Sequence, residues 1–506
     1  MKYGSIATGS IESLETAELI LRDGGNAFDA AIAAVFTSMT SEFALTGAGG
    51  GGTMLGMKAN ESPIVYDFFV DCPKLSKKDV EFSTMNVDFG DTKQQFHIGK
   101  GSIAVPGNIA GLLDIHEQNG KLPLKVILEP AINIANKGVI LSPYQAFINK
   151  LIEPILVLTP TGKELFTKNN AFLKEGELFN NPRFADFLIQ LGKDGKDFFY
   201  KNQIAKLIDT YFSKEGYISK ESLTNYSMQK RAPLSMNINN YSIFTNPAPA
   251  YSGSLMIFLL TILKNTNKLD ASIIDLIKAM EITSLARNDV CNNPENEMEI
   301  NNVLNDKIIQ KYQTLFLNDN YIRNISKLSG FGSTTHISVI DKDYNVASVT
   351  TTNGEGSGYF IPEFGIMMNN MLGEQDLNPY GFHQWKNIRR LPTMISPTII
   401  LKDNKPEFAI GSGGSNRIRS AIIQVIINLL IRNMPLKEAI SMPRLHLEGN
   451  ELFFEPDILL PKNHNDIKHL LLKPFHEKSL FFGGVNCVSP KQAIGDKRRG
   501  GVGKIF

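Results

Sequence analysis

Residues 330–358, GFGSTTHISVIDKDYNVASVTTTNGEGSG, have the pattern of a β-hairpin. Residues 335–340 and 346–352 are rich in Thr, Val and Ile, which favour strands, and residues 341–345 between them carry Asp and Asn, which favour turns. We therefore predict two antiparallel strands joined by a tight turn. Threonines gather where the first strand begins and where the second ends. Threonine favours strands in any case, but one of these side chains could also do chemistry.

Strand and helix patterns surround this hairpin. Helix patterns cover residues 12–39 with a break at 24–26, much of 107–330, and 418–431. Strand patterns cover residues 54–57, 64–70, 396–402 and 406–410. We find no internal repeat, low-complexity tract or Pro/Ser-rich linker that would divide the chain. Because strands flanked by helices pack as layers, we predict one layered α/β or α+β unit.

Charge and cysteine content argue against several classes of protein. The 506 residues include 52 basic and 51 acidic side chains, so no net field attracts nucleic acid or an anionic membrane. The three cysteines form no CxxC pair and the histidines lack metal-ligand spacing, so we expect no disulfide framework, no metal and no cofactor. The N-terminus lacks the apolar core of a signal peptide, and the longest apolar stretches are too short to span a bilayer. We expect a cytoplasmic protein that binds neither nucleic acid nor membranes.

Two glycine clusters are candidate ligand loops. The cluster at 47–52 lacks the Lys and Ser/Thr of a phosphate loop, and it follows a helix and precedes a strand, the reverse of a dinucleotide fingerprint. The two interpretations that remain for this cluster are a tight structural turn and a loop packed close to an active centre. The cluster at 411–415 lies between a strand and a long helix, so its N–H groups could bind an oxyanion or only form a turn. Its spacing is not GxSxG, which argues against an ordinary α/β-hydrolase.

Thr334 is a candidate nucleophile of a particular kind. A threonine hydroxyl needs a base to remove its proton, and no His and Asp lie at a spacing that indicates a triad. If the chain is cut just before Thr334, its own α-amino group, with a pKa of about 7.7–8.0, can serve as that base. The alternative is that Thr334 is an ordinary strand residue.

Several long motifs occur in a fixed order along nearly the whole chain, most sparsely between about 160 and 325. They are GSIATGSIESLETAELILRDGGNAFDAAIAA (4–34), GAGGGGTML (47–55), GSIAVPGNIAGLLDIHEQNGKLPL (101–124), PAINIANKG (130–138), STTHISVIDKDYNVASVTTTN (333–353), GIMMNNML (365–372), RRLPTMISPTI (389–399), GSGGSNRIRS (411–420), MPRLHLEGN (442–450) and GDKRRGG (495–501). Together these motifs resemble those of the γ-glutamyltranspeptidase, or glutathione hydrolase, family of N-terminal-nucleophile (Ntn) hydrolases.

The resemblance implies an α+β fold, the four-layer αββα Ntn-hydrolase sandwich, formed jointly by two subunits of one precursor. On this basis Thr334 Oγ attacks the carbonyl of Ser333, and water hydrolyses the resulting ester. Residues 1–333 would become the large subunit and residues 334–506 the small catalytic subunit, still associated as one structural unit.

The resemblance also implies an activity. Thr334 would attack the γ-amide of a γ-glutamyl compound such as glutathione, release the amine, and pass the acyl group to water, an amino acid or a peptide. Thr352 matches the threonine that positions the nucleophile. Gly413 and Gly414 match the pair whose amides form the oxyanion hole, which favours the functional alternative for that loop.

Three further residues match substrate-binding positions of the family. Asn353 matches an asparagine near the substrate, although two residues are missing here. Glu374 occupies the position of the acid that binds the α-amino group of the glutamyl moiety. Thr393 stands where the family has the first of two serines that hold its α-carboxylate.

Three positions depart from the family. Phe69 replaces the arginine that clamps the α-carboxylate, Met394 replaces the second serine, and Met371 replaces a glutamine. A phenylalanine cannot pair with a carboxylate. The departures favour an alternative enzyme with the same nucleophile but a different acyl group, such as glutaryl, a β-lactam side chain or poly-γ-glutamate. A third possibility is an unprocessed, inactive relative that serves as a binding protein, in which Thr334 stays internal.

Overall fold

A computed structural model describes residues 1–76, 79–88, 93–318, 333–461 and 467–506. The first three residues of the opening stretch, 330–332, lie outside this described part. The hairpin itself is confirmed: β13 (Thr335–Asp341) and β14 (Val346–Thr352) pair antiparallel, with Thr335 opposite Thr351.

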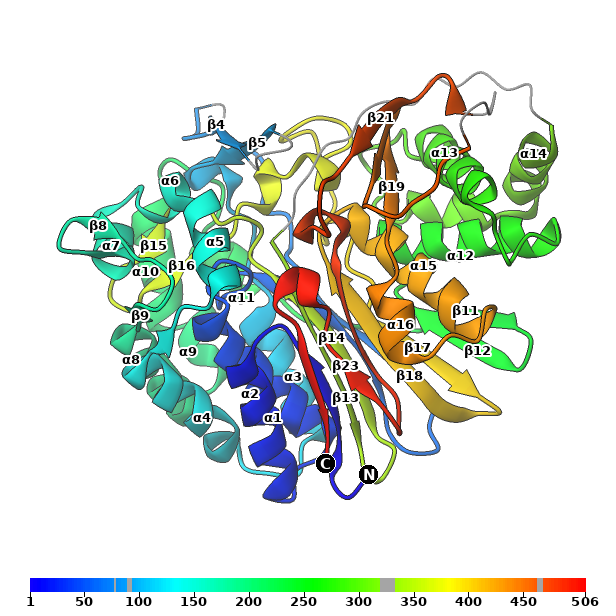
Figure 1. Ribbon diagram of the computed structural model, residues 1–506. Helices are drawn as coiled ribbons and strands as arrows, with labels where there is room; N and C mark the ends of the chain where they lie inside the picture. The colour runs from blue at the N-terminus through cyan, green and yellow to red at the C-terminus, as the bar shows by residue number, and fades with distance from the viewer. Residues whose placement is uncertain (77–78, 89–92, 319–332, 462–466) are drawn as a thin grey trace.

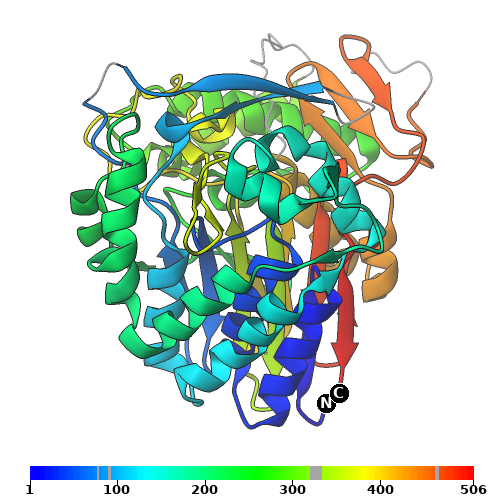
Figure 2. The same cartoon turned by 90° about the vertical axis from the view of Figure 1, so that its left-hand side faces the viewer.

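The hairpin forms the centre of a seven-stranded sheet with the order β10-β3-β2-β14-β13-β1-β24. Its other strands are β1 (Gly4–Thr8), β2 (Gly51–Met57), β3 (Ile64–Phe68), β10 (Gln229–Arg231) and β24 (Val502–Ile505). All of its neighbouring pairs are antiparallel. Because β24 pairs with β1, the two ends of the chain lie side by side, as Figure 2 shows.

A second sheet has six strands in the order β11-β12-β17-β18-β22-β23. Its members are β11 (Leu234–Ile238), β12 (Tyr241–Thr245), β17 (Thr398–Lys402), β18 (Lys405–Gly413), β22 (Gly484–Val488) and β23 (Ala493–Ile494). Strands β13 and β14 pack on β18. A hydrophobic cluster that includes Leu55 and Ile340 from the first sheet and Ile399 and Val488 from the second lies between them.

Helices cover the outer face of each sheet, so the molecule has four layers (Figure 1). On the first sheet, α2 (Ala27–Ser41) packs against β13 and β14, and α1 (Ile11–Arg22), α3 (Asn108–Asn119), α4 (Leu124–Lys137) and α8 (Pro182–Asp194) extend that layer. On the second sheet lie α12 (Tyr251–Asn265) and α15 (Arg417–Leu430), and α13 (Ile273–Val290) packs on α12. The remaining α-helices are α5 (Pro143–Leu151), α6 (Glu153–Leu156), α7 (Pro160–Phe166), α9 (Lys196–Tyr200), α10 (Gln203–Phe212), α11 (Lys220–Thr224), α14 (Asp306–Leu317) and α16 (Leu436–Ser441).

The predicted break between the first two helices is present, and Asn26 closes it with a capping box at the start of α2. Two other details differ from the prediction. The region from 107 onward, expected to be mainly helical, also supplies β11 and β12. These short strands are only half-buried, and β12 pairs with β17 while β11 pairs with β12. The local sequence does not reveal that they belong to this sheet. Strand β18 runs on through Gly413, since residues 411–413 pair with β22.

Within the described part of the chain, no helix combines the length and apolar character that crossing a membrane requires.

Candidate active site

Thr334 lies just before β13, at the end of the sheet where β14 also finishes. Ser333 and Thr334 are both buried, with about 5% and 4% of their surface exposed. In this intact chain they are joined by a peptide bond whose cleavage the sequence analysis predicts. The last residue of β14, Thr352, contacts the Ser333 carbonyl of this bond, and the last residue of β18, Gly413, lies against the carbonyl of Thr334. Two sheets therefore bring together the residues that the motifs singled out.

Thr352 contacts the carbonyl of the bond rather than the hydroxyl of Thr334. Its Oγ1 donates to the carbonyl oxygen of Ser333 at 2.5 Å and accepts from the N–H of Gly354 at 3.0 Å. The Gly354 contact fixes the orientation of the hydroxyl. A hydrogen bond to a carbonyl oxygen stabilises the negative charge that develops there when a nucleophile attacks the carbon.

Gly413 and Gly414 form a turn in which a larger residue has no room. A Cβ on Gly413 would lie 2.2 Å from the carbonyl oxygen of Thr334. Gly414 has φ of +123°, a conformation that favours glycine. On the other side, the guanidinium group of Arg499 lies 3.2 Å from the Cβ position of Gly413 and 3.1 Å from that of Gly414. The turn is therefore held between the predicted nucleophile and a buried cation.

The glycine-rich loop at 47–52 packs on the same end of β14. Gly51 and Gly52 belong to β2 and pair with Thr352 and Thr351, and Asn369 Nδ2 donates to the carbonyl oxygen of Gly49 at 2.7 Å. Of the two alternatives that the sequence left open for this loop, the contacts favour packing beside the candidate site.

Asn353 and Glu374 both lie close to Thr352. Asn353 is buried and donates to the carbonyl of Met367 at 3.2 Å. Glu374 is half-buried, and its Oε1 would be 2.5 Å from a Cβ on Gly354. Burial, then the charges of Glu355 and Asp376, raise the pKa of Glu374 well above its ordinary value.

Glu355 is a site residue that the sequence analysis missed. It is 1% exposed, its N–H donates to Asn370 Oδ1 at 3.0 Å, and its carboxyl accepts the N–H of Ser333. Burial raises the pKa of Glu355 to about 8. The sequence feature that could have indicated it is a single acidic residue in the glycine-rich segment GEGSG, three residues after Thr352.

The positions that depart from the family are buried in apolar surroundings. Phe69, Met371 and Met394 are 1%, 0% and 3% exposed and belong to one hydrophobic cluster. Thr393 is also buried, and its hydroxyl accepts from the N–H of Ile395 at 3.2 Å. The substrate-binding role of Thr393 stays a prediction.

One buried guanidinium lies next to Phe69 but is already bound. Arg390 Nη1 donates to the carbonyl oxygen of Phe69, and its Nε pairs with Asp71 at 2.9 Å. Nη1 also lies 3.4 Å from Asp67 and donates to the hydroxyl of Tyr226 at 2.9 Å. These contacts hold Arg390 in the protein framework.

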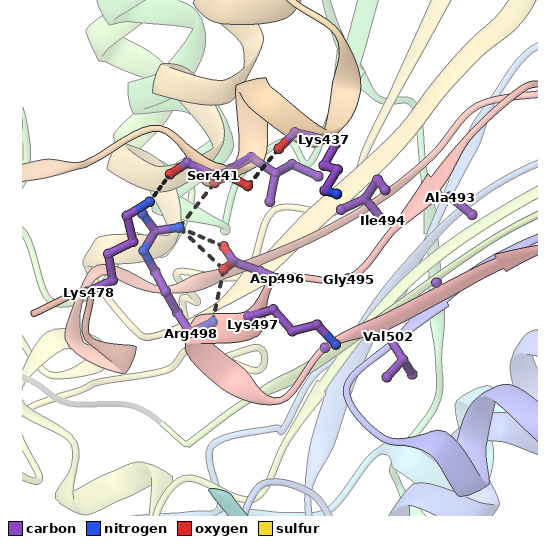
Figure 3. Close-up of a pocket in the computed structure, with 13 residues that line it drawn as sticks. Lys437, Ser441, Lys478, Ala493, Ile494, Gly495, Asp496, Lys497, Arg498 and Val502 are labelled. Carbon is purple, nitrogen blue, oxygen red and sulfur yellow. Dashed lines mark hydrogen bonds and ion pairs between the residues drawn. The ribbon is translucent and has the colours of Figure 1, made fainter.

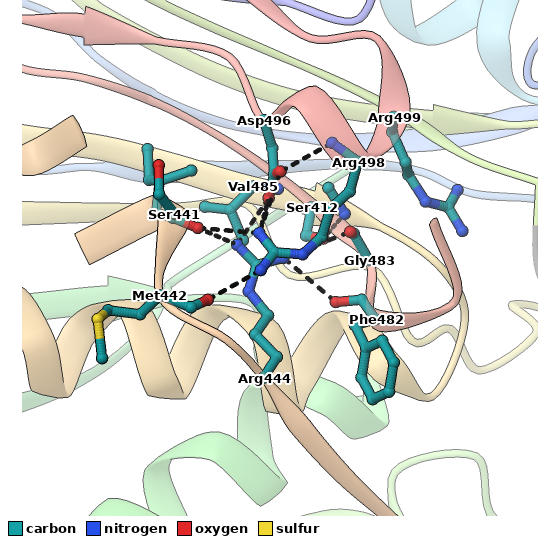
Figure 4. A network of polar contacts seen from close by, with 12 residues as sticks. Ser412, Ser441, Met442, Arg444, Phe482, Gly483, Val485, Asp496, Arg498 and Arg499 are labelled. Carbon is teal, nitrogen blue, oxygen red and sulfur yellow. Dashed lines mark hydrogen bonds and ion pairs between the residues drawn. The ribbon is translucent and has the colours of Figure 1, made fainter. Parts of the chain in front are cut away.

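A network of buried ions supports the strand end that carries Gly413 (Figure 4). Arg444 donates to Asp496 at 2.6 Å and to the carbonyl of Gly483 at 3.3 Å, and Arg498 approaches the same Asp496 at 3.3 Å. Although burial opposes it, the charges of Arg444 and Arg498 hold the pKa of Asp496 below its ordinary value. Ser412 accepts from the N–H of Gly484, which joins this network to β18.

A pocket of about 450 Å³ lies on the outer side of that network (Figure 3). Lys437, Ser441, Lys478 and Lys497 line it, together with residues 493–496, 498 and 501–503. Lys478 donates to the carbonyl of Ser441. None of the predicted site residues lines this pocket, so it is separate from the candidate site.

A sequence model of the family described as Gamma-glutamyltranspeptidase matches residues 14–503. This chain belongs to that family. Glutathione hydrolase 2 of Arabidopsis thaliana is 27% identical over 99% of this chain and 91% of its own length. The glutathione hydrolase proenzyme of Escherichia coli is 28% identical over 88% of this chain and 81% of its own. The capsule biosynthesis protein CapD proenzyme of Bacillus anthracis is 29% identical over 99% and 90%.

Solved structures support the fold of this γ-glutamyltranspeptidase family member. A cephalosporin acylase from Bacillus halodurans has a TM-score of 0.82 at 20% identity, with 100% of this chain and 96% of that chain covered. Helicobacter pylori γ-glutamyltranspeptidase has a TM-score of 0.53 at 25% identity, with 62% and 91% covered. The family, the enzyme class and the αββα fold expected from the resemblance are confirmed. The cleavage position and the individual residue roles stay predictions.

Proposed function

We propose that this family member is a proenzyme that cleaves itself between Ser333 and Thr334 and then transfers γ-glutamyl groups from amides to water, an amino acid or a peptide. The observation that carries the proposal is the hydrogen bond from Thr352 Oγ1 to the carbonyl oxygen of Ser333. It lies on the bond that must break, in a buried position where electrostatic stabilisation is strong.

The self-cleavage step conserves every atom of the chain and consumes one water. Thr334 Oγ adds to the carbonyl carbon of Ser333 while its proton passes to the departing nitrogen. The C–N bond breaks, and the chain continues through an ester. Water then hydrolyses the ester, which leaves a carboxylate on Ser333 and a free hydroxyl and α-amine on Thr334. Residues 1–333 and 334–506 remain together, because strands of the two segments pair in both sheets: β2 with β14, β1 with β13 and β24, and β12 with β17.

The catalytic cycle repeats this chemistry on a substrate. The α-amine of Thr334 takes the proton of Oγ, Oγ attacks the γ-amide carbonyl, and the leaving amine takes that proton as its C–N bond breaks. The amides of Gly413 and Gly414 would hold the oxyanion. Water or an acceptor amine then attacks the γ-glutamyl ester and restores the Thr334 hydroxyl. The partner substrates are therefore an acyl amide and a nucleophilic acceptor, and no metal or cofactor takes part in these steps.

A denaturing gel tests the first half of the proposal. The purified parent should give two fragments, the smaller beginning at Thr334 by N-terminal sequencing, while Thr334→Ala stays one chain. A Thr334→Ser control, which keeps a hydroxyl, should still cleave. An intact parent chain would refute the proposal and support the unprocessed binding relative. Release of p-nitroaniline from a γ-glutamyl anilide, with and without an acceptor dipeptide, tests the second half.

A second candidate keeps the Thr334 mechanism but changes the acyl group. Phe69, Met371 and Met394, buried in one apolar cluster, favour it because they remove polar groups where the family binds the glutamyl moiety. A cleaved protein that hydrolyses another acyl anilide but no γ-glutamyl anilide would establish this candidate.

A further inference from the structure

Arg499 is a buried cation beside the predicted oxyanion hole. It is 6% exposed and ends the short 3-10 helix η7 (Lys497–Arg499), which Asp496 caps. Its Nε donates to the carbonyl oxygen of Leu480 at 3.1 Å. Figure 4 shows Arg499 at the edge of the ion network that holds Asp496. The cap and the Leu480 contact therefore fix where this side chain starts and in which direction it leaves the helix.

Gly484 leaves room for the stem of the Arg499 side chain. A Cβ on Gly484 would lie 2.6, 2.8 and 2.9 Å from Cβ, Cγ and Cδ of Arg499. Gly484 is the first residue of β22 and pairs with Gly413, the last residue of β18. The stem therefore lies directly on the backbone of β22, and the guanidinium group reaches the end of β18.

The guanidinium group of Arg499 spans both glycines of the turn. Its Nη1 lies 3.2 Å from the Cβ position of Gly413, and its Nη2 lies 3.1 Å from that of Gly414. The carbonyl oxygen of Thr334 lies 2.2 Å from the same Cβ position of Gly413. The cation and the residue that carries the predicted nucleophile therefore contact one glycine, whose amide is predicted to bind the oxyanion.

The groups that act on Arg499 leave its charge in place at neutral pH. They are Tyr144, Asp496 and Glu355. Burial raises the pKa of Tyr144 to about 12 and that of Glu355 to about 8, so both are largely uncharged at pH 7. Asp496 is held in the two ion pairs described above. Burial lowers the pKa of Arg499, but an arginine keeps its proton in a folded protein.

Acyl transfer creates a negative charge beside this turn. Thr334 Oγ forms a bond to the carbonyl carbon of the substrate, the proton of Oγ passes to the α-amine of Thr334, and the π electron pair of the carbonyl moves onto its oxygen. The carbonyl of the bound substrate is neutral, whereas the oxyanion is charged. A nearby cation therefore stabilises the transition state more than the bound substrate, and the effect is strong because the site is buried.

We propose that Arg499 is a positioning residue for acyl transfer: its guanidinium group holds the Gly413–Gly414 turn in place and adds a positive charge beside the oxyanion that the two amides bind. The inference rests on the proposed function, because it concerns acyl transfer at Thr334. In the precursor, Thr352 holds the carbonyl oxygen of Ser333, so self-cleavage should depend less on Arg499 than substrate turnover does.

Two substitutions separate the charge of Arg499 from its packing. Arg499→Met keeps the length of the side chain and removes its charge, whereas Arg499→Lys keeps the charge. Lys497→Met, at an exposed position of the same short helix, is the matched control. Rates are measured with γ-glutamyl p-nitroanilide, or with the acyl p-nitroanilide that the parent hydrolyses if it rejects γ-glutamyl, and they are referred to the cleaved fraction on a gel.

The expected loss lies in kcat. Arg499→Met should lower kcat about tenfold to a hundredfold and leave KM within about threefold of the parent, while Lys497→Met keeps both values. Near neutral pH, Arg499→Lys should exceed Arg499→Met in kcat by at least about threefold. Burial lowers the pKa of a lysine, so kcat of Arg499→Lys should also fall above about pH 8–9 relative to the parent. A side chain that acts only by packing would add no such titration.

The outcomes separate this inference from the proposed function. If Arg499→Met does not mature, the pH profile of Arg499→Lys decides the result. An Arg499→Met variant with the kcat of the parent, an Arg499→Lys variant with no added titration or no faster than Arg499→Met, or two variants that both stay uncleaved would overturn the inference while Thr334 catalysis stands. A parent chain that does not cleave itself, or a cleaved parent that hydrolyses no acyl anilide, overturns the proposed function and the inference with it.

Discussion

Replacing Thr352 with valine removes one hydroxyl group and keeps the shape of the side chain. In the intact chain that hydroxyl donates to the Ser333 carbonyl oxygen at 2.5 Å. Loss of one donor at a developing oxyanion costs about 2.7–4 kcal/mol, or roughly 10²–10³ in rate. We therefore expect Thr352→Val to slow self-cleavage by about that factor. Thr352→Ser keeps the donor and should cleave within about tenfold of the parent.

A time course of cell-free synthesis measures the effect, since labelled precursor converts to fragments on a gel from the moment the chain folds. The valine variant also leaves the N–H of Gly354 without its acceptor, which lowers stability by about 1–3 kcal/mol. Urea unfolding of each variant in a Thr334→Ala background separates that loss from the effect on rate. If Thr352→Val cleaves within threefold of the parent while it remains folded, the hydrogen bond does not assist the reaction and our reasoning is wrong.

Three further predictions concern other parts of the site. Gly413→Ala places a methyl group 2.2 Å from the Thr334 carbonyl oxygen, so overpacking should destabilise the precursor by about 1–3 kcal/mol in urea unfolding and abolish cleavage on a gel. Glu42 is buried and accepts a hydrogen bond from the hydroxyl of Thr335, next to Thr334; burial raises the pKa of Glu42 from 4.5 to about 7, so the folded chain keeps this proton longer than the unfolded chain, and stability falls as pH rises through this window. Relative to the parent, Glu42→Gln should therefore gain up to about 1.4 kcal/mol of unfolding free energy per pH unit between pH 4.5 and 7, and a pH-independent difference would contradict this. Phe69→Arg should lower KM for a γ-glutamyl anilide, because a guanidinium can pair with the α-carboxylate, whereas an unchanged or higher KM would count against our account of Phe69.

The local sequence predicted the elements that depend on near neighbours. The hairpin at β13 and β14 follows from strand-favouring residues on both sides of a turn, and the break between α1 and α2 follows from Gly24, Gly25 and the capping residue Asn26. Motif order along the whole chain identified the family and, through it, the four layers. Both predictions rest on short segments of sequence, so neither required knowledge of contacts between distant residues.

Other features arise only from contacts between distant segments. Strands β11 and β12 were missed because β12 joins the sheet through β17, which lies more than 150 residues further on, and β11 joins it only through β12. Strand β18 extends through Gly413 because β22 pairs with it. The ion pair that supports this end of the strand joins Arg444 to Asp496, which lies 52 residues further along the chain. No local pattern contains such pairings.

The division between sequence and structure is sharpest at Thr334. The sequence by itself determined which threonine is the candidate nucleophile and which motifs accompany it. Only the tertiary structure decided that Thr352 holds the carbonyl of Ser333 and that Glu355 lies on its other side. It also decided that Phe69 and Met394 share one apolar cluster. The reason is physical: the identity of a side chain is local, but its pKa, its hydrogen-bond partner and the charge it faces depend on what the fold packs around it.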